Sequence, residues 1–481
     1  MNLKDRLTDK AFSIVGRAGD ELGLETYIVG GFVRDLFLER HSKDVDFVCV
    51  GPGINLARKT AEIIKEQTGR EPRLAVYANY GTAQLHLGRI ELEFVGARRE
   101  SYHRESRNPI VEEGTLDDDQ KRRDFTINAM AICINKDRFG ELVDPFGGIA
   151  DLQSKTLRTP LNPDITFSDD PLRMMRAIRF ATQLGFFISK PTFEAIKRNS
   201  GRISIISRER INDELSKILR SPKPSIGFKL LDMAGLLKLI FPELCALKGV
   251  ENQEGRGHKD NFLHTLQVLD NVAAKSDDEW LRWAALFHDI AKPRVKRYDS
   301  KLGWTFHNHN FIGEKMIPGI FRKMKLPMNE KMKFVAKMVG LHMRPQSVAD
   351  AGVSDSGVRR LITDAGNDIE ALMTLCEADI TSKIPQKVKR QLEGFAQLRK
   401  RMDEINAADD YRNWHNPING NEIMERYAIP GCPLVADIKQ GVKDAILDGL
   451  VENDHDAALL YADKIAVKRR DEILAMGGRL P

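Results

Sequence analysis

Two glycines followed by an Asp-x-Asp triplet form the first pattern in the chain that could do chemistry. They lie in "YIVGGFVRDLFLERHSKDVDFVCV", residues 27–50. Gly30 and Gly31 allow the backbone to turn and to approach a ligand closely. The helix predicted for "FVRDLFLER" begins directly after them, and a helix N-terminus favours an anion. This stretch therefore predicts a phosphate-binding turn.

Asp44 and Asp46 supply two carboxylates to one face of the strand predicted after that helix, because side chains alternate between the faces of a strand. Such carboxylates repel each other unless divalent cations bridge them, and Mg²⁺ prefers a few carboxylates combined with phosphate oxygens. A later strand, "RIELEFVGARR", carries Glu91 and Glu93 on one face, and we favour Glu93 as the third acid of a two-metal site. The alternative is a turn followed by an edge strand with exposed aspartates.

The elements that must position these residues change in character along the chain. Up to about residue 150, β-rich runs such as "TYIVGG" and "IELEFVG" alternate with helical stretches, which predicts a small mixed α/β domain. Beyond about residue 165 the pattern is almost continuously helical, interrupted by "LRSPKPSIG", "KIPQ" and "NPINGNE". With 481 residues we expect two to four domains. The fold class is therefore predicted to be α+β.

Composition excludes several other classes of protein. No apolar run approaches the about 18 residues that a membrane span needs, and the first residues do not resemble a secretory signal. The five cysteines are far apart and form no C-x-x-C pair, so we expect reduced thiols in the cytoplasm. The net charge of +5 is compatible with nucleic-acid binding where positive charge is clustered, at 96–107 and 386–401. Each cluster could equally be a solvated surface.

The opening stretch also resembles a known family. Gly-Gly with Asp-x-Asp resembles the nucleotidyltransferases of the DNA polymerase β superfamily, and "IVGGFVRDLFLERHSKDVDFV" resembles the first motif of class II tRNA nucleotidyltransferases, the CCA-adding enzymes and their poly(A) polymerase relatives. Four further motifs match in the expected order: "RRDFTINAMA", "DPFGGIADL", "DDPLRMMRAIRF" and "ISRERINDELSKIL".

This resemblance implies roles for the first motif. Asp44 and Asp46 would hold catalytic Mg²⁺, with Glu93 in the third carboxylate position, where many relatives carry Asp. Gly30, Gly31 and Arg34 would hold the triphosphate of CTP or ATP. The metals would lower the pKa of the RNA 3′-hydroxyl and neutralise the pyrophosphate leaving group. Arg34 could instead be a surface residue of its helix.

The second and fourth motifs supply the remaining nucleotide-site candidates. In the second motif, the resemblance implies a ribose site at Arg123, Asp124 and Asn128. The plain interpretation is a helix whose N-terminus Asp124 caps.

In the fourth motif, Pro171 suits a first helical turn with Asp170 as N-cap, and Arg173, Arg176 and Arg179 recur every three residues on one side. A capped, charged helix would explain this pattern. The resemblance implies instead that Asp170 and Arg173 form a protein template for the base of CTP or ATP, with Arg176 beside them. A carboxylate can accept a hydrogen bond from the exocyclic amine that cytosine and adenine both carry.

In the second half, "FLHTLQVL" contains His264, and "ALFHDIAKP" contains His288 and Asp289. These two stretches resemble an HD-type metal-dependent phosphohydrolase domain. The resemblance implies His264, His288, Asp289 and Asp379 as its metal ligands. His307, His309 and His342 could join a second metal or bind phosphate, and such ligands suit Mn, Fe, Co or Ni better than Mg alone. Six of the eleven histidines, including His258, lie between residues 258 and 342, although a single buried histidine is usually structural.

These observations predict four parts: a nucleotidyltransferase head at 1–150, a helical neck at 151–225, an HD-type body at 226–385 and a helical tail at 386–481 that resembles the tRNA-binding tail of the family. The expected function is addition of CCA to tRNA from CTP and ATP. Three alternatives remain open: a poly(A) polymerase; an enzyme that adds only CC or only A, a choice that depends on a flexible loop we place at 101–120; and an HD hydrolase whose head only binds RNA.

Overall fold

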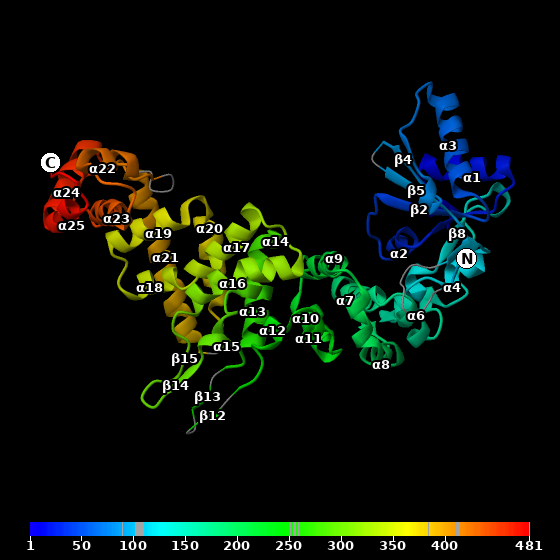
Figure 1. The fold of residues 1–481 in the computed structure, drawn as a ribbon. Coiled ribbons are helices and arrows are strands. Elements are labelled where there is room, and N and C mark those ends of the chain that lie inside the picture. The colour runs from blue at the N-terminus through cyan, green and yellow to red at the C-terminus, as the bar shows by residue number, and fades with distance from the viewer. Residues whose placement is uncertain are drawn as a thin grey trace. The chain divides into compact units, whose positions relative to one another are not determined.

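The computed structural model divides into two compact units, Met1–Ala246 and Leu247–Pro481, shown as ribbons in Figure 1. The residues that the structure describes are 1–88, 90–101, 110–250, 252–253, 256–257, 259–382, 384–408 and 414–480. His258 and residues 102–109, which belong to the suggested flexible loop and to the first positive cluster, lie outside them. In the part of the chain described, no helix combines the length and apolarity needed to cross a membrane.

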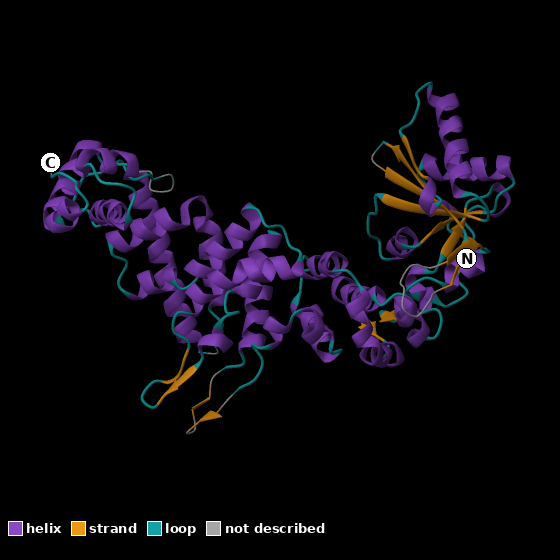
Figure 2. Cartoon of the chain, in the orientation of Figure 1, coloured by secondary structure: helices purple, strands orange, loops and turns teal. Residues whose placement is uncertain are grey.

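A mixed sheet forms the centre of the first unit (Figure 2). Among the described residues it has seven strands in the order β3-β4-β5-β2-β1-β8-β9. Their bounds are β1 Thr26–Val29, β2 Asp44–Cys49, β3 Leu74–Tyr77, β4 Thr82–Leu87, β5 Ile90–Gly96, β8 Ala131–Cys133 and β9 Leu142–Val143. β2 and β5 are parallel, whereas the other paired strands are antiparallel. A hairpin of β6 (Arg98–Ser101) and β7 (Ile110–Glu113) is separate from this sheet.

One face of the sheet is covered by helices α1 (Lys10–Leu22) and α3 (Gly53–Thr68), which pack against each other (Figure 1). The Phe47 ring of β2 stacks on the Phe94 ring of β5 with centroids 5.4 Å apart, and Phe12 of α1 contacts Phe47 at 6.5 Å. Both strand phenylalanines are fully buried. Since side chains alternate, the neighbouring acidic residues of β2 and β5 face the other side of the sheet.

Helices continue the first unit after the sheet. Their bounds are α2 Gly31–Phe37, α4 Leu116–Lys121, α5 Gly148–Gln153, α6 Pro163–Asp169, α7 Leu172–Leu184, α8 Lys190–Asn199, α9 Arg208–Leu219, α10 Ser225–Met233, α11 Leu236–Ile240 and α12 Pro242–Cys245. The short strands β10 (Thr156–Leu157) and β11 (Phe187–Ile188) pair between them. The α+β class is thus confirmed.

The plain interpretation of "RRDFTINAMA", residues 122–131, as a helix is wrong. This stretch forms a short 3-10 turn at Thr126–Asn128 and then enters strand β8. The turn is held by the buried Asp151 of α5, which accepts a 2.6 Å hydrogen bond from the Thr126 hydroxyl. The third sequence motif therefore positions the second.

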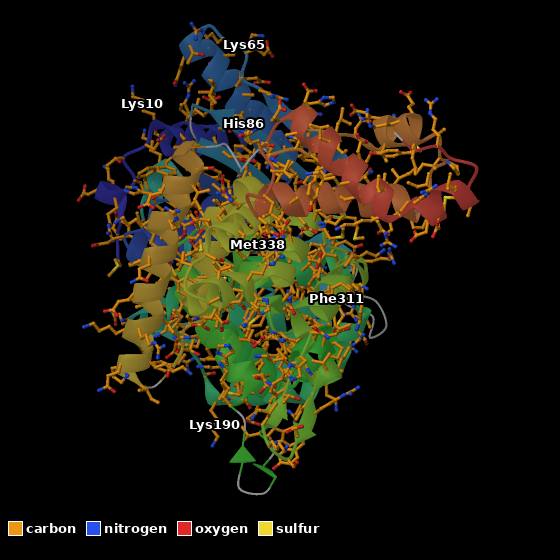
Figure 3. The ribbon with its side chains drawn as sticks, turned by 90° about the vertical axis from the view of Figure 1, so that its left-hand side faces the viewer. Lys10, Lys65, His86, Lys190, Phe311 and Met338 are labelled. Atoms are coloured by element: carbon orange, nitrogen blue, oxygen red, sulfur yellow. The ribbon has the colours of Figure 1, made fainter. Side chains whose placement is uncertain are left out.

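The second unit is largely helical and carries two small hairpins, β12–β13 (Asn252–Gln253 and Arg256–Gly257) and β14–β15 (Arg297–Asp299 and Gly303–Thr305). Its helices are α13 Asn261–Ala273, α14 Glu279–Phe287, α15 Lys292–Val295, α16 His309–Met324, α17 Glu330–Leu341, α18 Arg344–Asp350, α19 Asp355–Ala365, α20 Ile369–Asp379, α21 Pro385–Ala408, α22 Gly420–Tyr427, α23 Pro433–Leu447, α24 His455–Lys468 and α25 Arg470–Ala475. Met338 is buried in its core, whereas half of Phe311 is exposed (Figure 3). The second positive cluster, 386–401, lies on α21.

Candidate active site

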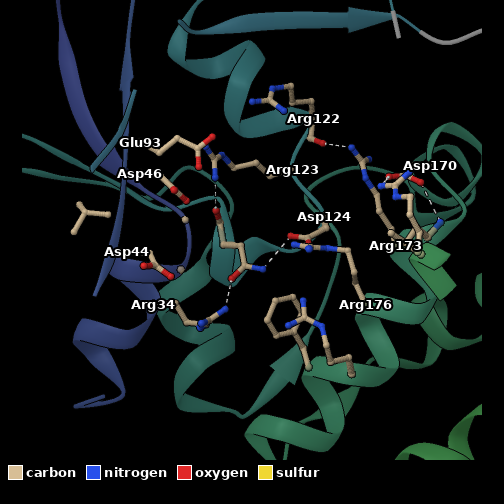
Figure 4. Close-up of a pocket in the computed structure, with 18 of the residues that line it drawn as sticks. Arg34, Asp44, Asp46, Glu93, Arg122, Arg123, Asp124, Asp170, Arg173 and Arg176 are labelled. Carbon is tan, nitrogen blue, oxygen red and sulfur yellow. Dashed lines mark hydrogen bonds and ion pairs between the residues drawn. The ribbon is translucent and has the colours of Figure 1, made fainter. Parts of the chain in front are cut away.

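A pocket of about 730 Å³ in the first unit gathers the head and neck residues that the sequence pointed to (Figure 4). It is lined by Gly30, Gly31, Arg34, Asp44, Asp46, Glu93, Arg123, Asp124, Asn128, Asp170, Arg173 and Arg176. In Figure 4 the carboxylates of the sheet lie at one end, and Asp170 with Arg173 lies at the other. The space between them has the size of a small-molecule site.

The acidic end of the pocket is built by two parallel strands. Asp46 of β2 pairs in register with Glu93 of β5, and Asp44 pairs with Glu91. Because β2 lies between β5 and β1, the alternative of an exposed edge strand is wrong. Burial raises the pKa of Asp46, and Arg123 only partly offsets this effect. Loss of hydration and the neighbouring Asp46 also raise the pKa of Glu93.

Carboxylates of this kind suit a divalent cation. Oxygen donors crowded on one face repel each other when ionised, and a bound divalent cation removes that repulsion. The raised pKa values mean that protons compete with the metal at these oxygens. We therefore expect Mg²⁺ affinity to fall as the pH is lowered toward the pKa of Asp46 and Glu93.

Gly30 lines the pocket close to both Arg123 and Asp46, which carry opposite charges. Its backbone has φ = 76°, a left-handed conformation that favours glycine. A β-carbon built there would lie 3.1 Å from Arg123 Nη1 and 3.2 Å from Asp46 Oδ2. A side chain at this position would therefore displace a group of the site as well as strain the turn.

Arg34, on α2, is only 9% exposed, so the surface alternative for this residue is wrong. Its Nε and Nη2 atoms each donate to the carboxylate of Asp35 at 2.9 Å, and Nη1 donates to Asn128 Oδ1 at 2.9 Å. The guanidinium is thus held at the pocket wall by partners from two different segments.

Asp124 connects the second motif to helix α7. One carboxylate oxygen accepts from Arg176 Nε at 2.7 Å, and the other accepts from the Phe125 amide and from Asn128 Nδ2. Burial alone would raise the pKa of Asp124, but Arg176 and these hydrogen bonds outweigh it and lower the pKa to about 2. Asp124 therefore stays ionised and orients Arg176 and Asn128 at the pocket.

The far end of the pocket is formed by the start of α7. The helix begins at Leu172 with Pro171 as its N-cap, one residue later than predicted, although Asp170 Oδ1 still accepts from the Leu172 amide at 3.1 Å. Arg173 donates from Nη2 to the backbone carbonyl of Arg122 at 2.6 Å. Arg210 of α9 approaches Asp170 to 3.7 Å.

Asp119 is a residue that the sequence analysis missed. Its side chain is fully buried, and its two carboxylate oxygens pair with Arg122 at 2.5 Å and with Arg123 at 2.9 Å. It thereby fixes both arginines at the pocket. The spacing of three and four residues within "DDDQKRRD" was the available signal, but such a charged run usually lies on a solvated helix face.

Phe180 organises a second set of arginines that the sequence analysis did not connect. The guanidinium carbons of Arg34, Arg176 and Arg179 lie 5.1, 5.4 and 4.0 Å from the centre of its ring. Arg179 is also paired with the buried Glu214 of the fifth motif at 2.6 Å. These contacts hold the positive wall of the pocket together.

The second unit contains a separate cluster of ligand-type side chains, all buried except Asp379. Two groups are close enough to hold a metal ion: His264, His288 and Asp379, and Asp289, His309 and His342. Asp289 Oδ2 lies 3.3 Å from His288 Nε2 and 3.6 Å from His264 Nε2, so the two groups adjoin. All four predicted HD ligands are thus brought together. His307 is exposed and does not belong to either group.

Hydrogen bonding leaves nitrogen lone pairs facing this cluster. The Nδ1 atoms of His288, His309 and His342 face backbone carbonyls at 2.7, 2.8 and 2.7 Å, which requires them to carry the proton. The Nε2 atoms of His309 and His342 then face each other at 3.2 Å.

Protonation does not readily relieve this contact, because burial and the nearby His288 lower the pKa of His342 to about 4. Nε2 of the buried His288 lies 3.3 Å from Asp289 Oδ2 and 3.7 Å from Asp379 Oδ1. A cation with a preference for imidazole and carboxylate ligands fits this arrangement.

Three family models match the chain in sequence. They are the poly(A) polymerase head domain at residues 26–158, the probable RNA- and SrmB-binding site of polymerase A at 185–248, and the HD domain at 261–405. The first covers the sheet and most of the pocket-lining residues. The third covers both ligand groups of the second unit.

Similar proteins carry related names. An A-adding tRNA nucleotidyltransferase of Deinococcus radiodurans is 30% identical over 441 residues, which cover 89% of this chain and 93% of the relative. A multifunctional CCA protein of Shewanella frigidimarina is 33% identical over 63% of this chain and 70% of its own length. A solved tRNA nucleotidyltransferase, in complex with a primer tRNA and an incoming ATP analogue, aligns with a TM-score of 0.55 and 26% identity over 80% of this chain and 98% of its own.

Proposed function

The chain belongs to the tRNA nucleotidyltransferase family with a poly(A) polymerase-type head and an HD domain, and from this premise we propose that it adds C, C and A to the 3′ end of tRNA from CTP and ATP. One observation carries the proposal. A single pocket places the three carboxylates on the sheet opposite an arginine-rich wall and the Asp170–Arg173 pair. That arrangement suits a nucleoside triphosphate and its metals better than a neutral ligand.

In this proposal the RNA 3′-hydroxyl gives its proton to solvent water as its oxygen forms a bond to the α-phosphorus. The bond from the α-phosphorus to the bridging oxygen breaks, and pyrophosphate leaves. Asp44, Asp46 and Glu93 hold the metal ions. Gly30, Gly31 and Arg34 hold the triphosphate in line for attack, and Arg123, Asp124 and Asn128 face the ribose. Bound Mg²⁺ would lower the pKa of the attacking hydroxyl and neutralise the leaving group. Base choice comes from the start of α7, where Asp170 accepts from an exocyclic amine and Arg173 donates to the ring edge.

Sequencing the 3′ ends of product tests this function. A tRNA transcript lacking CCA and a second transcript ending in CC are each incubated with the full-length protein, Mg²⁺, CTP and ATP. We expect both to end in CCA and to stop there. Extension of the second transcript alone would identify an A-adding enzyme, the second candidate, which the name of the Deinococcus radiodurans relative favours. A long A tail would identify a poly(A) polymerase.

Asp119 should act as a positioning residue for this reaction. Asp119→Asn removes the negative charge that pairs with Arg122 and Arg123. We therefore expect the KM for CTP and ATP to rise about tenfold, which corresponds to the free energy of one charge-assisted hydrogen bond. Asp117→Asn is the matched control, because Asp117 lies on the same helix and is exposed. Equal KM values for the two variants would contradict the positioning role of Asp119. Thermal unfolding of both variants shows whether a change in KM comes instead from a loss of folding.

We further propose an HD-type phosphohydrolase activity in the second unit. The observation that favours it is the adjoining pair of His and Asp groups, with two imidazole nitrogens facing one another. Water would attack the phosphorus of a phosphate ester, the bond to the alcohol oxygen would break, and that oxygen would take a proton. Metals at such a site would be Mn, Fe, Co or Ni rather than Mg alone.

Metal analysis of the purified protein tests the second site. We expect His288→Ala to lose most of a bound transition metal, because its Nε2 faces both Asp289 and Asp379. His307→Ala should keep the metal, since His307 is exposed and outside both groups. Both variants should retain nucleotide addition. Equal metal content in the two variants would contradict the site, and hydrolysis of a model phosphate ester is measured in parallel.

The division into head, neck, body and tail at 1–150, 151–225, 226–385 and 386–481 is also part of this proposal, as is a cytoplasmic location. In it, basic residues of the neck and tail meet tRNA phosphates, so tRNA affinity should decrease steeply as salt is raised.

A further inference from the structure

The face of the sheet that carries the three carboxylates continues past them onto two further strands. Figure 1 shows β4, β5 and β2 side by side, and β3 follows β4 at the edge of the described sheet. Gln84 of β4 pairs in register with Glu93 of β5, which in turn pairs with Asp46 of β2. Directly paired residues point to the same face of a sheet. The three side chains therefore form one row, and all of them line the pocket of about 730 Å³.

This continuation of the face is open to solvent. His86 of β4 is exposed, and Tyr77 of β3 is 47% exposed. Ala83 and Leu85, which alternate with Gln84 along β4, point to the other face and are fully buried, because α3 packs there. Gln84 therefore lies beside the carboxylates on the side away from β1, where a long substrate has room to enter.

Tyr77 orients the Gln84 amide. The Tyr77 hydroxyl donates to Gln84 Oε1 at 3.4 Å. With its oxygen turned toward Tyr77, the Gln84 side chain offers the two hydrogens of Nε2 to a ligand in the pocket. A hydroxyl oxygen is a suitable acceptor for such a donor.

The geometry of in-line substitution indicates which part of the substrates reaches Gln84. The attacking oxygen and the leaving pyrophosphate lie on opposite sides of the α-phosphorus. In the proposed reaction the triphosphate lies at Gly30 and Gly31, which follow β1 on one side of the carboxylates, so the RNA end approaches from the other side, over β5 and β4.

The chemistry of the RNA end then brings one particular group to Gln84. The 2′- and 3′-hydroxyls of ribose lie on neighbouring carbons, and neighbouring strands are about 4.8 Å apart. When the 3′-oxygen lies at Asp46 and Glu93, the 2′-hydroxyl of the same ribose is within reach of the next strand, where Gln84 is the residue in the row.

We propose that Gln84 contacts the 2′-hydroxyl of the last RNA nucleotide, with Nε2 donating to the 2′-oxygen, and that Tyr77 is the positioning residue that orients this amide. The inference rests on the nucleotide addition proposed above and extends it. The contact gives the head a means of distinguishing an RNA end from a DNA end, because the 2′-hydroxyl is the group that differs between them. It also aligns the neighbouring 3′-oxygen for attack.

Combined removal of the 2′-hydroxyl and of the amide tests this contact. A tRNA ending in CC, and the same tRNA with a 2′-deoxy last ribose, are each extended with ATP and Mg²⁺ by full-length wild type, Gln84→Ala and the control Gln67→Ala. Gln67 is exposed on α3, which covers the opposite face. We expect the single-turnover rate of wild type to be about tenfold lower on the deoxy end, the effect of losing one hydrogen bond.

The variants should separate the contact from a general loss of activity. Gln84→Ala should be about tenfold slower than wild type on the ribose end and should lose nothing further on the deoxy end, since the two changes remove the same interaction. Gln67→Ala should behave as wild type, and the KM for ATP should stay unchanged in both. Tyr77→Phe keeps the ring but not the hydroxyl, and it should weaken the preference for the ribose end.

Equilibrium binding of the two tRNAs with Mg²⁺ but without ATP gives a readout that needs no turnover. Wild type should bind the ribose end more tightly, and Gln84→Ala should bind both ends equally. Extension by wild type at equal rates on both ends would overturn the contact and leave the proposed function. A deoxy penalty that persists in Gln84→Ala would overturn it as well. Failure of wild type to extend the ribose end would reject the proposed function, and the binding preference would then decide the contact alone.

Discussion

Asp46→Asn should reduce nucleotide addition to tRNA by about a thousandfold or more, because a metal-binding carboxylate contributes several kcal/mol to the transition state of phosphoryl transfer. Asp46 lies on the interior strand β2, in register with Glu93, and Gly30 lies close to its Oδ2 atom. The measurement is single-turnover addition with saturating CTP, ATP and Mg²⁺. Binding of tRNA, measured separately, should remain near the wild-type value, since the change removes a catalytic group.

The same variant should not lose stability. Burial raises the pKa of Asp46 in the folded protein, so its ionised form weakens folding at pH values above the unfolded pKa, and this penalty disappears as the pH falls. A neutral asparagine avoids that penalty. The melting temperature of Asp46→Asn without metal at pH 7 should therefore equal or exceed that of wild type. Asp213→Asn is the control, because Asp213 is exposed and pairs with Lys217 outside the pocket. Full activity of Asp46→Asn would remove the metal assignment.

Arg173→Ala should relax the choice of nucleotide. Arg173 lies at the opposite end of the pocket from the sheet carboxylates, and its side chain is fixed by the carbonyl of Arg122 (Figure 4). Loss of its hydrogen bonds to the base should lower kcat/KM for CTP and ATP about tenfold or more, with a smaller change for UTP and GTP. The ratio of kcat/KM values for the four nucleotides is the measurement.

Arg198→Ala is the matched control for this experiment. Arg198 belongs to the same unit, pairs with Asp164 at the surface and does not line the pocket. A uniform decrease for all four nucleotides in Arg173→Ala would mean that Arg173 holds the triphosphate or the fold rather than the base. Unchanged discrimination at unchanged rate would exclude the template role altogether.

Local patterns determined much of this protein from its sequence. The period of two in "DVDFV" placed Asp44 and Asp46 on one face, and the same period in "IELEFVG" placed Glu91 and Glu93 on one face of a later strand. The register of β2 and β5 then brings Glu93 opposite Asp46. The ordered motifs predicted the family and the α+β class. The HD pattern selected His264, His288, Asp289 and Asp379 before any geometry was known, and these residues do meet.

The tertiary structure decided which charged side chains pair with each other. The helix expected at residues 122–131 is a short turn because Asp151 holds Thr126 from outside the segment. In the sequence, Asp119 belongs to a charged run of the kind that usually lies on an exposed helix face. In the structure its side chain is buried and pairs with Arg122 and Arg123. The first outcome depends on a partner from another segment and the second on burial, and a local pattern contains neither.

The same division holds for the two centres as a whole. Sequence alone determined which residue types are available: carboxylates on neighbouring strands, arginines along one side of α7, and histidines concentrated in one stretch. Only the tertiary structure decided that Arg173 reaches a carbonyl 51 residues away. It also decided that His309 and His342 face each other while His307 is exposed to solvent. Lys259 and Lys387, which are distant in sequence, likewise line one pocket. The physical reason is that packing selects among possible partners, and it acts between segments that are distant in the chain.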